Sequence, residues 1–231
     1  MLLRMKLLLF DIDGTLLRVT GGVHSAVSHA ISTVTGHTLS TNGVAFAGRT
    51  DPAIFTDVLR VSGVADPAAV LDDVIQTYAE RAQQTIAPSD VELLPGVAAL
   101  LTALAHRDDV CLGLVTGNVE SIAYHKLQSG GLADHFVAGG AFGSDHVNRN
   151  ELPPTAVRRA STHAGHSFSP HQTVVIGDTE HDIHCARAVG ARVAAVCTGG
   201  HPRDALQAHT PDLLFDTFQH TDAVIDQLLD V

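Results

Sequence analysis

Two aspartates separated by one residue follow an apolar segment near the start of the chain. Asp11 and Asp13 come directly after the apolar residues 7–10, and Gly14 and Thr15 come directly after the pair. A short apolar run of this kind is typical of a buried strand, and glycine permits a tight turn at its end. Beyond the strand, one carboxylate could attack a substrate as a nucleophile while the other moves protons.

Two later apolar runs also end in residues that could contact a substrate or a metal ion. The run 110–115 is followed by Thr116-Gly117-Asn118, and the run 173–176 by Gly177-Asp178-Thr179. Open α/β sheets bind their ligands at the carboxyl ends of the strands. We therefore expect both clusters to meet Asp11 and Asp13 in one crevice.

The segments Asp11-Ile12-Asp13-Gly14-Thr15-Leu16, 114–118 and 177–182 resemble three motifs of the haloacid dehalogenase-like hydrolase superfamily, in the same order. The resemblance covers essentially the whole chain, and phosphoglycolate-phosphatase-like members with a helical cap are most similar in pattern. It implies that Asp11 forms an aspartyl-phosphate and that Asp13 protonates the leaving oxygen and later accepts a proton from water. In the haloacid dehalogenases proper the second aspartate is replaced, so Asp13 favours phosphorus over carbon as the electrophile.

The same resemblance assigns the oxygens of the transferred phosphoryl group to the second motif. Thr116 would donate its hydroxyl to a phosphoryl oxygen, and the backbone N–H groups around Gly117 and Asn118 would assist it. Taken alone, a strand that ends in Thr-Gly-Asn is also compatible with a plain turn.

A magnesium site is implied by the last motif. Asp178 would bind Mg²⁺ together with the carboxylate of Asp11 and the backbone carbonyl of Asp13, because this cation prefers oxygen ligands in an octahedral arrangement. Asp182, one helical turn after Asp178, would support the site from behind or hold a lysine.

One residue of the commonest family pattern is missing here, the lysine that should stabilise the charge on Asp11. Many relatives place a Lys-Pro pair ahead of the helix that precedes the last motif, but residues 149–154 contain no lysine here. Lys6 precedes the first strand and lies at the wrong end of the sheet. We therefore assign the role to Lys126, with Arg149 as the second candidate because a guanidinium also pairs well with phosphate.

Strand-like and helix-like segments alternate along the chain, which predicts an α/β fold with a Rossmann-like, mostly parallel sheet. The expected strands are 7–10, 110–115, 136–138, 173–176, 192–196 and 213–215, and the expected helices between them are 97–105, 121–130, 155–164, 182–189 and 201–208. Residues 18–91 instead have helical periodicity, at 23–35, 52–61 and 67–87. We expect an inserted α-helical cap at 18–91, hinged near 17–20 and 89–92, on a core formed by residues 1–17 and 92–231.

One segment of the expected cap could contact the substrate. Arg49 lies in Gly48-Arg49-Thr50-Asp51, and relatives often carry a similar segment. A guanidinium in a subdomain that closes over an anion is a reasonable substrate contact. Alternatively, Thr50 or Asp51 caps the helix that begins near Pro52, and both roles are compatible.

Composition narrows the classes of partner. The net charge of −11 disfavours nucleic acid and anionic membranes as partners.

Three widely spaced cysteines are expected to be reduced thiols in a cytoplasmic protein. The start of the chain is expected to be a strand and not a signal peptide. The fifteen histidines include the pairs His163/His166 and His181/His184, which we expect to lie on the surface and not in a metal site.

The resemblance implies Mg²⁺-dependent hydrolysis of a small phosphorylated metabolite, a phosphomonoester, through an aspartyl-phosphate. A phosphotransferase similar to β-phosphoglucomutase shares Asp11, Asp13 and the cap, and would pass the phosphoryl group to a sugar hydroxyl. A C–halogen or C–P hydrolase is disfavoured by Asp13 and by a cap without lysine. From a different class, a phospho-accepting signalling module or a non-catalytic binder stays open. The sequence favours no particular metabolite or oligomeric state.

Overall fold

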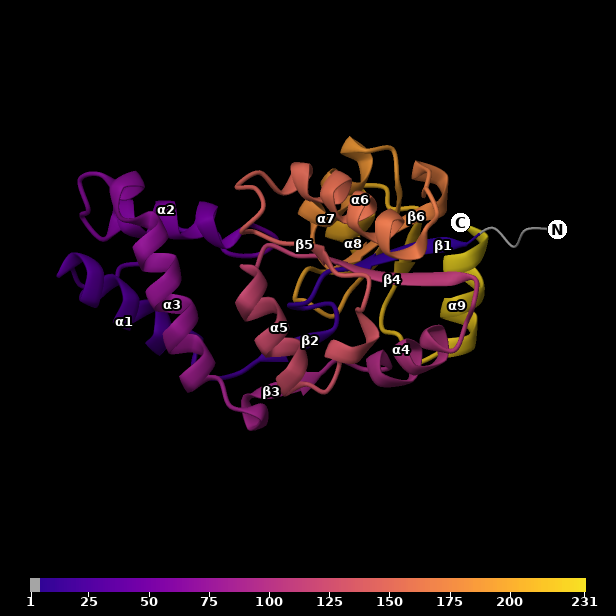
Figure 1. Cartoon of the computed structure of the whole chain (residues 1–231), viewed down its shortest axis with the longest axis horizontal. Coiled ribbons are helices and arrows are strands. Elements are labelled where there is room, and N and C mark those ends of the chain that lie inside the picture. The colour runs from indigo at the N-terminus through magenta and orange to yellow at the C-terminus, as the bar shows by residue number, and fades with distance from the viewer. Residues whose placement is uncertain (1–4) are drawn as a thin grey trace.

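The computed structural model describes residues 5–231 and contains a six-stranded sheet with a group of helices at one end of the molecule (Figure 1). The strands in spatial order are β5 (Gly140–Ala141), β4 (Val110–Val115), β1 (Lys6–Phe10), β6 (Thr173–Gly177), β7 (Arg192–Val196) and β8 (Leu213–Phe215). Every pairing in this sheet is parallel. The predicted α/β fold with a mostly parallel sheet is confirmed.

Strand β1 lies at the centre of the sheet and brings the polar strand ends together. Phe10 pairs with Leu114 of β4 on one side and with Ile176 of β6 on the other. Because neighbouring parallel strands end at the same edge, the residues that follow β1, β4 and β6 lie next to one another.

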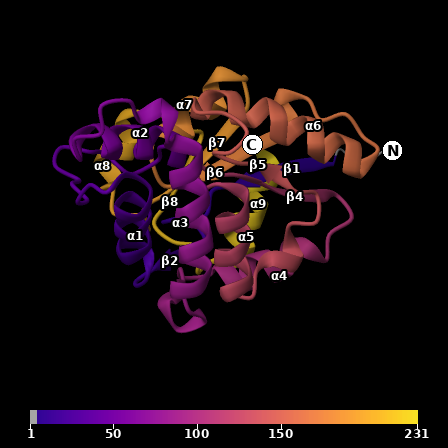
Figure 2. The ribbon, with the colours of Figure 1, turned by 60° about the vertical axis from the view of Figure 1, so that its left-hand side comes forward.

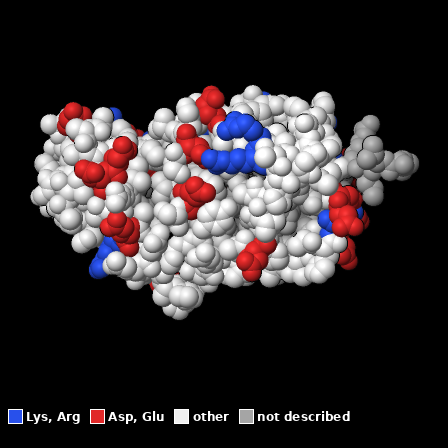
Figure 3. All heavy atoms as spheres, in the orientation of Figure 1, with Lys and Arg blue, Asp and Glu red and all other residues white. Residues whose placement is uncertain are grey.

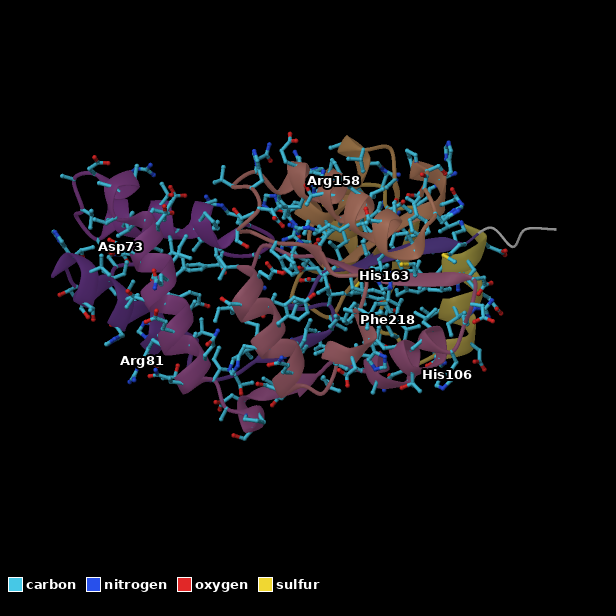
Figure 4. All side chains as sticks on the ribbon, in the orientation of Figure 1. Asp73, Arg81, His106, Arg158, His163 and Phe218 are labelled. Carbon is cyan, nitrogen blue, oxygen red and sulfur yellow. The ribbon has the colours of Figure 1, made fainter. Side chains whose placement is uncertain are left out.

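Helices cover both faces of the sheet (Figures 1 and 2). One face packs against α4 (Val97–Ala105), α5 (Glu120–Ser129) and α9 (Thr221–Asp230), and the other against α6 (Leu152–Ala164), α7 (Glu180–Ala188) and α8 (Arg203–Ala208). Alternate residues of β1 point to opposite faces, so Leu8 belongs to the first core cluster and Leu9 to the second. Figure 4 shows Phe218 inside the first of these layers.

A separate apolar cluster is formed by the helices α1 (Val23–Thr35), α2 (Asp51–Val61) and α3 (Leu71–Thr85). Val119 at the start of α5 and Ile122 within α5 also belong to it. We call residues 20–90 the helical insert. It connects to the sheet through an antiparallel ribbon of β2 (Leu17–Val19) and β3 (Val91–Leu93). The division into a core of residues 1–17 and 92–231 and a cap of residues 18–91 stays a prediction. Residues 1–4, at the start of the predicted core, lie outside the described residues.

The predicted strand at 136–138 was wrong. Gly139 has a φ of +74° and donates its N–H to the carbonyl of Phe136, so the chain turns there and the strand begins only at Gly140. Val137 is 71% exposed, unlike the buried strand residue that its apolar type suggested.

Helix α9 was not predicted from the sequence. Helix α6 begins three residues earlier than expected, because Pro153 and Pro154 fit the first turn of a helix. Short 3₁₀ turns occur at Pro67–Ala69, Pro88–Asp90, Ala133–His135, Arg149–Glu151 and Pro170–Gln172.

Charged side chains are unevenly spread on the surface. Figure 3 shows acidic residues in several separate places on one face, whereas basic residues gather over α6, which carries Arg158 and Arg159. No helix within residues 5–231 combines the length and the apolar character that a membrane span requires.

We predict that Gly96→Ala destabilises the protein far more than Gly36→Ala. Both glycines have positive φ, +89° and +71°, but only at position 96 would a Cβ overlap the backbone, 2.1 Å from the carbonyl carbon of Phe218. The left-handed conformation costs an alanine about 1–2 kcal/mol at either site. Chemical denaturation should therefore give Gly96→Ala the larger loss by at least about 2 kcal/mol. Equal losses would show that the loop moves freely away from Phe218.

Candidate active site

Three carboxylates converge where β1 and β6 end. Asp11, Asp178 and Asp182 are all buried, and they offer oxygens that lie within 4.8 Å of one another. Burial raises the pKa of Asp11 to about 6, against the opposing effect of Arg149. Burial, followed by the charges of Asp182 and Asp11, raises the pKa of Asp178 well above its usual value. The cluster thus concentrates negative charge that requires cations nearby.

Arg149 supplies one of these cations. Its Nη2 atom lies 3.2 Å from Oδ1 of Asp11 and 2.5 Å from Oδ1 of Asp182. The 3₁₀ turn Arg149–Glu151 at the start of α6 holds the side chain at this edge of the sheet. The second candidate from the sequence is therefore the residue that faces Asp11. Its Nε atom has no hydrogen-bond partner within the described part of the chain.

Lys126 faces the other aspartate of the pair. Its Nζ atom lies 2.9 and 2.7 Å from the two carboxylate oxygens of Asp13 and 2.7 Å from Oδ1 of Asn118. The expectation that Lys126 would face Asp11 was wrong, because α5 directs its side chain to Asp13. Lys126 is nevertheless at the site, as the sequence predicted, and it is buried.

Asn118 links Lys126 and Asp13 to the end of β4. Its Nδ2 atom donates to Oδ2 of Asp13 at 2.6 Å and to Oγ1 of Thr116 at 3.0 Å. Thr116 and Asn118 therefore lie beside the aspartate pair, where the sequence placed them.

The residues around Asp178 suit a hard divalent cation. One carboxylate oxygen of Asp178 accepts a hydrogen bond from Thr15 at 2.9 Å, while Gly199 packs so closely that a Cβ there would lie 1.6 Å from the other oxygen. Both oxygens of Asp182 are already engaged, by Arg149 and by the N–H and hydroxyl of Thr179. Carboxylates of Asp11 and Asp178 are thus the available ligands, and oxygen donors are those that Mg²⁺ prefers.

Arg49 lines the same cavity, but its guanidinium is paired within the helical insert. Nη2 lies 2.8 Å from Oδ2 of Asp57, and Nη1 donates to the carbonyl of Ala45 at 3.0 Å. The helix cap expected at Thr50 or Asp51 is formed by Thr50. It is the N-cap of α2, and its hydroxyl oxygen accepts a hydrogen bond from the N–H of Ala53 at 3.4 Å.

Asp51 connects the helical insert to the core, a role that the sequence did not predict. From the sequence, Asp51 was expected only as a possible helix cap. Its N–H donates to the carbonyl of Gly117 at 2.7 Å, and its Oδ2 accepts from the N–H of Val119 at 2.8 Å. A Cβ on Gly117 would lie 2.0 Å from the carbonyl oxygen of Arg49, so a glycine is required for this approach. Asp51 thereby joins the helical insert to the loop between β4 and α5.

The insert also contacts Arg149 and the loop that precedes it. Nη1 of Arg149 donates to the carbonyl of Gly48 at 3.1 Å, and the hydroxyl of Thr50 donates to the carbonyl of Val147 at 2.6 Å. The insert and the two aspartates together enclose a cavity of about 480 Å³.

Residues 8–196 match the family described as haloacid dehalogenase-like hydrolase. The chain belongs to this family. It is 27% identical to phosphoglycolate phosphatase from Salmonella paratyphi A over 152 residues, which cover 66% of this chain and 58% of that protein. The chain therefore spans little more than half the length of that curated relative.

Two further similarities extend over nearly the whole chain. Phosphoglycolate phosphatase from Vibrio vulnificus is 27% identical over 240 aligned positions, covering 98% of this chain and 95% of that protein. A hydrolase structure from Pseudomonas syringae has a TM-score of 0.70 at 17% identity, covering 96% of this chain and 99% of that one, which supports the fold alone.

We predict that the effect of Asp51→Asn on stability depends on pH. Burial raises the pKa of Asp51 to about 6, against the opposing effects of Lys126 and the Val119 N–H. Protonated Asp51 therefore favours the folded state below about pH 4, and this contribution is lost as the pH rises through 6. Relative to the wild type, Asp51→Asn should gain free energy of unfolding between pH 4 and 7 in urea denaturation.

The matched control is Asp73→Asn, which changes an exposed aspartate of α3 (Figure 4). A pH profile for Asp51→Asn that is parallel to this control would contradict the assigned cause.

Proposed function

We propose that the protein is a Mg²⁺-dependent phosphatase that hydrolyses a small phosphomonoester through an aspartyl-phosphate on Asp11. The observation that carries the proposal is the environment of Asp11, a buried carboxylate with a guanidinium 3.2 Å away at the floor of a cavity. Membership of the hydrolase family and the phosphatase names of the relatives support it.

In the first step, a carboxylate oxygen of Asp11 attacks phosphorus, and the bond to the ester oxygen breaks. Asp13 donates its proton to that departing oxygen, which leaves as the alcohol. In the second step, Asp13 removes a proton from water as the water attacks phosphorus, and this releases inorganic phosphate and restores Asp11.

The two cations have different roles in this proposal. Arg149 stabilises negative charge on Asp11 and on the phosphoryl group, the role that we first assigned to Lys126 from the sequence. Lys126 and Asn118 fix the carboxylate of Asp13 toward the ester oxygen. The hydroxyl of Thr116 and the backbone N–H groups near Gly117 bind the phosphoryl oxygens.

Asp11 and Asp178 would hold Mg²⁺, with the Asp13 backbone carbonyl as a further ligand and Asp182 holding Arg149 in place. The cation would offset the repulsion between Asp11 and an anionic substrate. In the absence of an added divalent cation, hydrolysis should therefore be lost.

Residues 18–91 act as a cap in this proposal. The hydrogen bonds between Asp51 and the loop 117–119, and the one from Arg149 to Gly48, hold the cap against the core, where it excludes bulk water from the acyl phosphate. We place the enzyme in the cytoplasm, acting on a small phosphorylated metabolite.

We predict that Asp11→Asn lowers kcat for p-nitrophenyl phosphate at least about 10³-fold, because the amide is a poor nucleophile. Hydrolysis is followed as release of p-nitrophenol with Mg²⁺ present and after chelation. Asp134→Asn, a change in the distant turn Ala133–His135, is the matched control and should retain wild-type activity. Full activity in Asp11→Asn would refute the proposed mechanism.

The roles of the two cations can be separated by the leaving group. A p-nitrophenolate leaves without protonation, whereas an alkoxide requires a proton from Asp13. We predict that Lys126→Met lowers kcat at least about tenfold more for butyl phosphate than for p-nitrophenyl phosphate, while Arg149→Met lowers both by similar factors.

The ratio between the two substrates does not depend on the amount of folded enzyme, so partial unfolding cannot imitate the result. Equal losses on both esters in Lys126→Met would show that Lys126 acts on the phosphoryl group and not through Asp13.

A further inference from the structure

One part of the lining of the catalytic cavity is apolar. The helical insert and its β2 connection contribute Val19, Val23, Phe46 and Ile54 to this wall. An ester bound at Asp11 with its alcohol part toward the insert would contact these side chains.

The apolar wall continues outside the catalytic cavity. A neighbouring groove of about 580 Å³ shares Val19, Val23 and Phe46 with it and adds Val27 and Leu39. Phe46 is 45% exposed although it is a large apolar residue. Val19, Val23 and Phe46 therefore form an apolar boundary between the two hollows, next to the aspartates' cavity.

The charged groups around the cavity are poorly placed to bind a second anion. Arg49, the guanidinium of the insert, is neutralised by Asp57 at 2.8 Å, and the carboxylate of Asp51 is turned toward the core. Arg18 also lines the cavity, but it is exposed at the rim and donates to the carbonyl of Thr198 at 3.0 Å.

One polar group on the wall lacks a partner. Tyr78 is 3% exposed and packs against Phe55 with ring centroids 4.9 Å apart, and its hydroxyl makes no hydrogen bond within residues 5–231. Tyr78 nevertheless lines the cavity. A hydroxyl that lines the cavity can donate a hydrogen bond to a ligand atom there, or accept one from it.

We propose that the alcohol part of the substrate is uncharged and predominantly apolar, and that it lies against Val23 and Phe46 with one hydrogen bond to Tyr78. The inference rests on the proposed phosphatase function and names its substrate class. It differs from what the names of the relatives suggest, because the alcohol part of phosphoglycolate carries a carboxylate.

A series of n-alkyl phosphates tests the proposal, because ethyl, butyl and hexyl phosphate leave as alcohols of nearly equal acidity. Each added methylene that enters the groove should raise kcat/KM by about two- to fourfold. Ethyl phosphate should also be hydrolysed at least as efficiently as phosphoglycolate. A flat or falling series would overturn the proposal.

Phe46→Asp should lower kcat/KM for hexyl phosphate at least about tenfold and for ethyl phosphate less than about threefold. Val61→Asp, which introduces the same charge at an exposed position of α2 outside the cavity, is the control. Tyr78→Phe keeps the aromatic packing and should lower kcat/KM for 4-hydroxybutyl phosphate more than for butyl phosphate. Equal effects of Phe46→Asp on both alkyl esters would overturn the assigned groove.

Arg18→Gln tests the opposite possibility. A preference of at least tenfold for phosphoglycolate over ethyl phosphate that disappears in Arg18→Gln would show an anion subsite and overturn the proposal. Absence of Mg²⁺-dependent turnover for every ester, p-nitrophenyl phosphate included, would overturn the proposed function together with the inference. Turnover without a chain-length trend would overturn the inference alone.

Discussion

The burial of three carboxylates within 4.8 Å of one another is the constraint on which the rest of the site depends. Each ionised group loses hydration and repels the other two, so the cluster is stable only with compensating positive charge. Arg149 provides part of it through contacts with Asp11 and Asp182. Burial raises the pKa of Asp11 although the charge of Arg149 opposes this effect, and a divalent cation, as proposed above, would add further positive charge.

The two aspartates of the opening motif have separate cations, and this separation suits two different tasks. Asp11 lies against a guanidinium that is fixed by Asp182 and cannot exchange a proton. Asp13 is more exposed, with a side chain 44% accessible, and is held by Lys126. In the proposed mechanism, Asp11 as the nucleophile and Asp13 as the acid–base group are thus placed in different environments two residues apart.

The same network extends to the helical insert. Arg149 donates to Gly48, and Asp51 binds the loop that follows Thr116. The position of the insert is therefore coupled to two parts of the site, and a displaced insert would alter the surroundings of both aspartates.

Residues that follow strands could be placed from the sequence, because strand order and direction bring their ends to one edge. Asp11, Thr116 and Asp178 meet for this reason. The pairing of cations with aspartates could not be predicted in this way, since it depends on the direction of each side chain. From the sequence, Lys126 was expected at the site but facing Asp11. In the structure Arg149 faces Asp11, and Lys126 faces Asp13.

Sequence patterns also could not predict which side chains pair when the pairing depends on how loops fold. The Arg49–Asp57 pair depends on how the loop before α2 folds back, and the Asp51–Val119 bond joins segments 68 residues apart. At Phe136, apolar composition predicted a strand, whereas Gly139 in a left-handed conformation set the turn.

In the proposed mechanism, Asp11 carries the phosphoryl group during turnover. The most direct measurement is rapid acid quenching with substrate and Mg²⁺, followed by borohydride reduction of the acyl phosphate and peptide mapping by mass spectrometry. We expect homoserine at position 11, only when both substrate and Mg²⁺ are present. Homoserine at another aspartate, or rapid turnover with none at position 11 at any quench time, would contradict it.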